Sequence, residues 1–119
     1  MHEYVHGIEK IAKTAKDAIE TGDVSLLAQC MNDSQILFDR CAMPNCKSEL
    51  TSPKLHQIMN DLFVRNESLA IKGVGSQGDG SAQILCENAA QQNKVSFVTS
   101  RVCIDVLFAN LLFAEILRF

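Results

Sequence analysis

The sequence predicts an α+β domain in which helices pack on one face of a small antiparallel sheet. Three observations predict it: apolar residues recur at helical spacing over residues 5–38, a further helical stretch begins at Ser52 and Pro53, and two short apolar runs flank a glycine-rich segment. An amphipathic helix has to bury its apolar stripe against another layer, and the hairpin formed by the two runs offers one. The length of 119 residues suits a single domain.

The first two helices are expected to form an antiparallel hairpin. Apolar side chains recur every three or four residues from Val5 to Ile19, and Gly22 follows as a residue suited to end a helix. Asp23 is a good N-cap for a second helix, which should run to about Arg40. The short turn at residues 21–23 then places the two helices side by side.

A third helix and a pair of strands follow a loop at residues 42–47. Ser52 is expected as the N-cap of this helix and Pro53 as its first residue, and the helix should end near Asn66. The strands are expected at residues 69–72 and 81–86, on either side of the glycine-rich segment.

The composition changes after Lys94, which divides the chain into a domain at residues 1–94 and an apolar tail at residues 95–119. The tail is expected to be helical, packed on the domain or on a partner, because its apolar residues lie on nearly all sides of a helix; a further strand is the alternative. An exposed apolar tail would favour a homodimer or a poorly soluble species. Four polar residues argue against a membrane span: Arg101, Asp105, Asn110 and Glu115.

Charge and cysteine content narrow the class of protein. A net charge of −3 without a basic stripe argues against nucleic acid as a partner. Five cysteines without a framework spacing indicate a reducing compartment, and hence the cytoplasm. Cys41, Cys46 and His56 could be read as zinc ligands, but the cysteine spacing is loose and a fourth ligand is not evident. Ordinary thiols are therefore favoured.

The most informative segment is KGVGSQGDGS at residues 72–81, which holds four of the six glycines. Glycine lets the backbone approach a ligand closely, and successive N–H groups in such a turn can bind one anion. The segment GVGSQG matches G-x-G-x-x-G, but a strand is expected after it where dinucleotide binding needs a helix, and the G-K-[ST] ending of a Walker loop is missing. A phosphate- or substrate-contacting loop is one interpretation, and a mobile hairpin turn is the other.

The order of these elements resembles the C-terminal domain of the GHMP kinases, the family of galactokinase, homoserine kinase and mevalonate kinase. Three segments carry the resemblance: MNDSQIL at residues 31–37, SPKL at residues 52–55 and GVGSQGDG at residues 73–80. The resemblance covers roughly residues 5–88 and implies a ferredoxin-like plait. Gln77 and Asp79 depart from the family pattern, in which this loop is nearly all glycine and alanine.

The resemblance implies the C-terminal, substrate- and nucleotide-contacting part of an ATP-dependent small-molecule kinase, with a sugar as the expected substrate class. ATP and Mg²⁺ are the implied cofactors, and an N-terminal kinase domain is the implied partner. That domain supplies the family's P-x-x-x-G-L-G-S-S loop and catalytic acidic residue, which have no counterpart here, so no catalytic residue is assigned and the chain alone is not expected to be active. A non-catalytic binding or interaction module with the same fold is the alternative. The implied contact residues are Gly73, Gly75, Ser76, Gln77, Gly78, Asp79 and Gly80.

Overall fold

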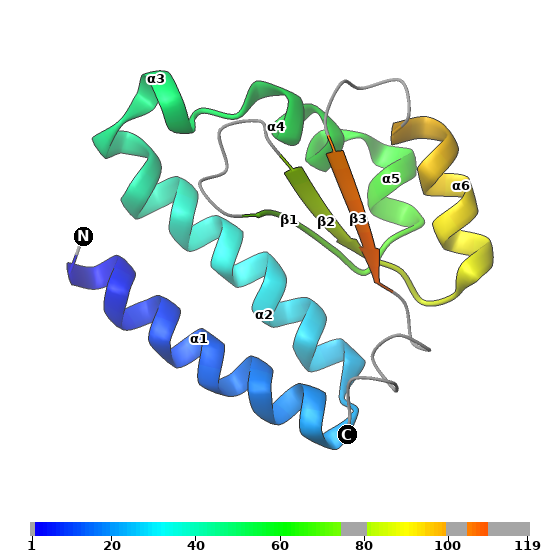
Figure 1. Cartoon of the computed structure of the whole chain (residues 1–119), viewed down its shortest axis with the longest axis horizontal. Helices are drawn as coiled ribbons and strands as arrows, with labels where there is room; N and C mark the ends of the chain where they lie inside the picture. Colours follow the sequence, from blue (N-terminus) through cyan, green and yellow to red (C-terminus); the bar gives the residue numbers. More distant parts are fainter. Residues whose placement is uncertain (1, 75–80, 100–104, 110–119) are drawn as a thin grey trace.

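A computed structural model describes residues 2–74 and 81–99, together with the backbone of residues 105–109. Figure 1 shows helix α2 along one side of a small sheet, α1 beyond it, and α4, α5 and α6 on the opposite side. The elements in chain order are α1 His2–Thr21, α2 Val24–Leu37, the π-helical turn η1 Phe38–Ala42, the 3₁₀ turn η2 Met43–Asn45, α3 Lys47–Leu50, α4 Pro53–Asn60, α5 Leu62–Asn66, β1 Ala70–Gly73, β2 Ser81–Leu85, α6 Ala89–Thr99 and β3 Asp105–Ala109.

The sheet has the strand order β1-β2-β3 in the described part of the chain. Strands β1 and β2 are antiparallel, with Ala70 opposite Leu85 and Gly73 opposite Ala82. The α+β class and the hairpin are thus confirmed. The expectation of a purely antiparallel sheet is wrong, because β3 runs parallel to β2. A parallel neighbour needs a crossover connection, and α6 lies in the connection between these two strands.

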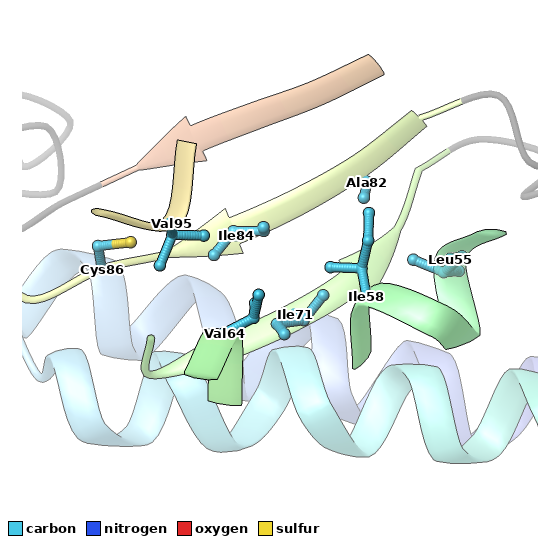
Figure 2. Packing of buried hydrophobic residues seen from close by; sticks show 8 residues of the cluster. All are labelled: Leu55, Ile58, Val64, Ile71, Ala82, Ile84, Cys86 and Val95. Carbon is cyan, nitrogen blue, oxygen red and sulfur yellow. The ribbon is translucent and has the colours of Figure 1, made fainter. Parts of the chain in front are cut away.

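Helices cover both faces of the sheet, so the expected packing on one face is also wrong. Side chains alternate between the faces of a strand. Ala70 and Leu85 pack with Ala28 and Met31 of α2 on one face. The other face carries the larger cluster, which Figure 2 shows between the strands and the helices α4, α5 and α6: Leu55, Ile58, Val64, Ile71, Ala82, Ile84, Cys86 and Val95. Both faces of these strands are apolar, and two apolar faces require two covering layers.

The helical hairpin forms as the sequence predicts. Gly22 has a φ of 71°, the left-handed conformation that ends a helix. The carboxylate of Asp23 accepts a hydrogen bond from the backbone N–H of Leu26 at 3.0 Å and so caps α2. Gly7 lets α1 approach α2 closely, because a Cβ there would lie 2.6 Å from Cδ2 of Leu37.

The expected third helix is interrupted, which corrects the single span from residue 53 to Asn66. Asp61 leaves the helical conformation, with φ −71° and ψ 120°, and its carboxylate accepts from the backbone N–H of Val64 at 3.0 Å. An aspartate that caps a new helix competes in this way with continuation of the old one. The expected loop at residues 42–47 likewise contains the end of η1, all of η2 and the first residue of α3.

The expected boundary between residues 94 and 95 falls inside α6, and Val95 is fully buried in the larger cluster. The helical expectation for the tail therefore holds for residues 95–99, whereas residues 105–109 form a strand. Residues 100–104 and 110–119 lie outside the described part of the chain. Among the described residues, no helix combines the length and the apolar character that crossing a membrane requires.

Candidate functional site at the base of the glycine-rich loop

The β1–β2 hairpin brings the two ends of the glycine-rich segment together. Gly73 is the last residue of β1 and lies opposite Ala82. The backbone N–H of Val74 donates to the carbonyl oxygen of Ser81 at 3.2 Å. Of the predicted contact residues, Gly73 is the one in the described part of the chain, while Gly75, Ser76, Gln77, Gly78, Asp79 and Gly80 lie outside it.

Two amide side chains of α2 hold the outer edge of β1. The backbone N–H of Gly73 donates to Oε1 of Gln35 at 2.7 Å, in a buried position. The backbone N–H of Ile71 donates to Oδ1 of Asn32 at 3.4 Å, and Nδ2 of Asn32 donates to the carbonyl of Leu69 at 3.4 Å. An edge strand otherwise presents unpaired backbone groups. The side chains of Asn32 and Gln35, three residues apart and hence on one side of α2, satisfy these groups.

A chain of hydrogen bonds leads from Gly73 into the protein. Gln35 is 1% exposed, and its Nε2 donates to Oδ1 of Asp39 at 3.0 Å. The other carboxylate oxygen of Asp39, Oδ2, lies 2.9 Å from Nε2 of His56. Nδ1 of His56 lies 2.8 Å from the carbonyl oxygen of Ser52. We call this hydrogen-bonded series of residues the relay: Gly73, Gln35, Asp39, His56 and Ser52.

Two unusual backbone segments belong to the relay. Asp39 lies in the π-helical turn η1, a rare conformation that is frequent at functional sites. Ser52 has φ 49° and ψ 62°, and among the described residues it is the one non-glycine residue with a positive φ. A left-handed residue with a Cβ costs roughly 1–2 kcal/mol. Ser52 occupies the predicted N-cap position of α4 before Pro53, but its hydroxyl makes no capping bond.

The relay favours the charged form of His56. Both ring nitrogens face oxygen atoms that only accept hydrogen bonds, so both contacts are satisfied when the ring carries two protons. Burial lowers the pKa of His56, but the hydrogen bonds to Asp39 and to the Ser52 carbonyl, with the charge of Asp39, outweigh it, and the pKa is raised from 6.5. When His56 carries both ring protons, it forms an ion pair with the Asp39 carboxylate within the relay.

Lys72 adds a half-buried positive charge beside Gly73. Its Nζ donates to the carbonyl oxygen of Gly73 at 2.7 Å. Burial lowers the pKa of Lys72 from its ordinary value, because the ammonium has lost part of its hydration. A cation of this kind at the start of a glycine-rich loop can contact an anionic group.

The possible zinc ligands do not gather at one point. Among the described residues no group of three or more His, Cys, Asp or Glu side chains is arranged to hold a metal ion. His56 is engaged by Asp39 and Ser52 instead. Cys41 and Cys46 are free thiols, as are Cys30 and Cys86.

A cavity of about 430 Å³ lies beside the start of β1, at the opposite end of that strand from Gly73. Its wall contains exposed Ile36 and Leu69 and the cationic Arg65. Asn32 belongs both to this wall and to the edge of β1. The volume of the cavity alone would favour it as a site. The half-buried Lys72 lies beside Gly73, however, and a chain of hydrogen bonds links Gly73 to His56, so we take the base of the glycine-rich loop as the candidate site.

Sequence reasoning missed Gln35, Asp39 and His56 as partners of the loop. One signal was present: Gln35 lies between Met31 and Phe38 on the helix face that the apolar residues mark as buried. A polar side chain in a buried stripe has to find hydrogen-bond partners. Its contact with a residue 38 positions away could not be read from spacing.

Comparisons with protein-family models, with curated proteins and with solved structures found no match to this chain.

Proposed function

We propose that this chain is the C-terminal, substrate- and nucleotide-contacting part of an ATP-dependent small-molecule kinase of the GHMP type, with a sugar as its substrate class. In this proposal the domain is a variant of the GHMP ferredoxin-like plait that differs in its parallel third strand and in the helices on both faces of its sheet. It works in the cytoplasm and combines with an N-terminal kinase domain that supplies the catalytic groups. ATP and Mg²⁺ bind between the two parts.

One observation carries the proposal: the relay connects the three segments on which the resemblance rests. Gln35 belongs to the segment at residues 31–37, Ser52 to the segment at residues 52–55, and Gly73 to the glycine-rich segment. These residues are far apart in the sequence, and the hydrogen bonds through Asp39 and His56 join them. A GHMP-type fold, with the loop in the role that it has in that family, would account for the meeting of these three segments.

The chemistry at the base of the loop also supports the proposal. Phosphoryl transfer depends mostly on positioning and on stabilisation of negative charge. Gly73 is held by Gln35, so the loop starts from a fixed point, and the Lys72 ammonium lies beside that point. A bound phosphate would compensate this half-buried charge.

Nucleotide binding tests the proposal directly. A ¹⁵N-labelled sample is titrated with Mg·ADP and, separately, with inorganic phosphate and sugar phosphates while amide shifts are followed by NMR. We expect the amides of Gly73, Val74 and Ser81 to shift in the presence of Mg·ADP. Lys72→Met should weaken this binding several-fold. Lys94→Met is the matched control, because Lys94 is exposed and pairs with Glu67 at the other end of β1.

Two results would overturn the proposal. Absence of shifts at these amides with every phosphate ligand would favour the non-catalytic interaction module. Equal effects of Lys72→Met and Lys94→Met would show that binding is unspecific. Turnover is a further check: with ATP, Mg²⁺ and a panel of sugars, the isolated chain should release no ADP above background, and sustained sugar-dependent release would contradict the need for an N-terminal partner.

A further inference from the structure

The cavity at the start of β1 takes no part in the proposed function. Three segments of the chain form its wall. Asn32 and Ile36 lie four residues apart, and hence on one side of α2. The corner between α4 and α5 forms a second side, and residues 68–71 form the third. The volume of about 430 Å³ falls within the range of small-molecule sites.

Arg65 places a positive charge in this wall. Among the described residues that line the cavity, it is the only one with an ionisable side chain. Within residues 2–74 and 81–99 its guanidinium has no ion pair and no hydrogen bond. Its acidic neighbours in the sequence are engaged elsewhere, since Asp61 caps α5 and Glu67 lies 3.8 Å from Lys94. A guanidinium in this position favours an anion with two acceptor oxygens.

The same wall presents aliphatic side chains to water. Ile36 is 60% exposed and Leu69 is 36% exposed, although both are large and apolar. Met59, at the end of α4, is half-buried in the same wall. Removal of such surface from water favours the binding of an apolar group. Apolar side chains gathered around a cavity with a few polar groups are typical of a ligand site.

The hydrogen bonds at the edge of β1 favour a small molecule over an added peptide strand. The outward N–H of Ile71 donates to Asn32. The next outward N–H, that of Gly73, donates to Gln35. An extended peptide along β1 would have to break both bonds. The single charge of Arg65 also matches a carboxylate better than a phosphate ester, which carries nearly two negative charges at neutral pH.

We propose that this cavity binds a small amphipathic carboxylate, whose carboxylate group contacts the Arg65 guanidinium. Its aliphatic chain packs against Ile36, Met59 and Leu69. Charge-assisted hydrogen bonds to the guanidinium fix the orientation of the ligand, and the apolar wall binds its chain. Asn32 stays bound to β1, so the ligand fills the cavity without opening the edge of the sheet. The site lies at the opposite end of β1 from the glycine-rich loop and does not depend on the proposed function.

Octanoate is the probe for this site, because it combines one carboxylate with an aliphatic chain. A ¹⁵N-labelled sample of the full chain is titrated with octanoate while amide and arginine side-chain shifts are followed by NMR. Octanol, which keeps the chain alone, and acetate, which keeps the carboxylate alone, are the control ligands. We expect octanoate to shift the amides of Leu69 and Ile71 and the Nε–Hε signal of Arg65 to saturation. Octanol and acetate should bind several-fold more weakly.

Two substitutions in the wall separate the roles of charge and apolar contact. Arg65→Gln should weaken octanoate binding several-fold and leave octanol binding unchanged, because it removes an exposed cation and little apolar surface. Arg40→Gln is the matched control, because Arg40 is also exposed but lies 2.6 Å from Glu3 of α1 and outside the wall. Ile36→Ala should weaken the binding of octanoate and of octanol alike, since it shortens the apolar wall.

Three results would contradict a carboxylate site in the cavity. They are the absence of saturable shifts at the wall amides with octanoate, equal affinity for octanoate and octanol, and equal effects of Arg65→Gln and Arg40→Gln. Octanoate shifts confined to Gly73, Val74 and Ser81 would place the ligand at the glycine-rich loop and would equally refute the proposal. Mg·ADP is expected to shift those loop amides instead, so failure of either titration refutes the corresponding site alone.

Discussion

Replacement of Gln35 by methionine is the sharpest test of the relay as a structural feature. Gln35 accepts from the buried N–H of Gly73 at 2.7 Å and donates to Asp39 at 3.0 Å. Methionine has a similar length and volume, so Gln35→Met removes both hydrogen bonds without opening a large cavity. The effect on the free energy of unfolding then comes almost entirely from the lost polar contacts.

The magnitude follows from what each lost contact leaves behind. A buried N–H without a partner costs about 1–3 kcal/mol. A hydrogen bond to a charged group contributes about 1.5–3 kcal/mol, but Asp39 is 26% exposed, so water can replace part of this one. We therefore expect Gln35→Met to lower the free energy of unfolding by about 2–4 kcal/mol.

Urea denaturation of the purified variants measures this difference. Gln29→Met is the matched control, because Gln29 lies exposed on the same helix, and a surface change of this kind should stay within about 0.5 kcal/mol. Asn32→Ala should have a smaller effect than Gln35→Met, because both bonds of Asn32 are 3.4 Å long and the side chain is exposed. Equal stability of Gln35→Met and the wild type would refute the hydrogen bond from the Gly73 N–H to Gln35.

Three further predictions follow from burial and charge. Burial lowers the pKa of His56, but Asp39 and the Ser52 carbonyl raise it above 6.5 in the folded state. The stabilisation from protonated His56 is therefore complete below the unfolded-state pKa of 6.5 and is lost as the pH rises through the folded-state pKa. His56→Gln should flatten the dependence of the free energy of unfolding on pH in that range. Ile84→Ala should lower the free energy of unfolding by about 2–5 kcal/mol, since Ile84 is 0% exposed. Ile36→Ala is the control and should change the stability little, because Ile36 is 60% exposed. Similar effects of the two substitutions in thermal or urea unfolding would contradict the placement of Ile84 in the core. The expected homodimer is best tested by Phe97→Ser, because Phe97 is 69% exposed, whereas deletion of the tail would also remove buried Val95. We expect a lower mass by light scattering, and an unchanged mass would exclude Phe97 from the interface.

Local patterns in the sequence determined the elements whose start and end depend on neighbouring residues. The apolar repeat of α1, the left-handed Gly22 and the Asp23 cap all act within a few residues, and each was found where the sequence predicted it. The antiparallel hairpin was predictable for the same reason, since two short apolar runs flank one glycine-rich turn. In the candidate site, Gly73 was predicted because glycine density is visible in the sequence.

Tertiary contacts decided the features that join distant parts of the chain. A third strand beside β2 and a second helical layer on the sheet depend on which apolar surfaces meet, and the order of elements along the chain leaves several such pairings open. The apolar periodicity of residues 53–66 predicts one continuous helix, but that helix ends at Asp61 because the Asp61 carboxylate caps α5. The relay is the clearest case, since Gln35 lies 38 residues from Gly73 and Asp39 lies 17 residues from His56. Hydrogen bonds between such residues carry no periodic signal, and only the packing of α2, α4 and β1 brings their donors and acceptors within reach of one another.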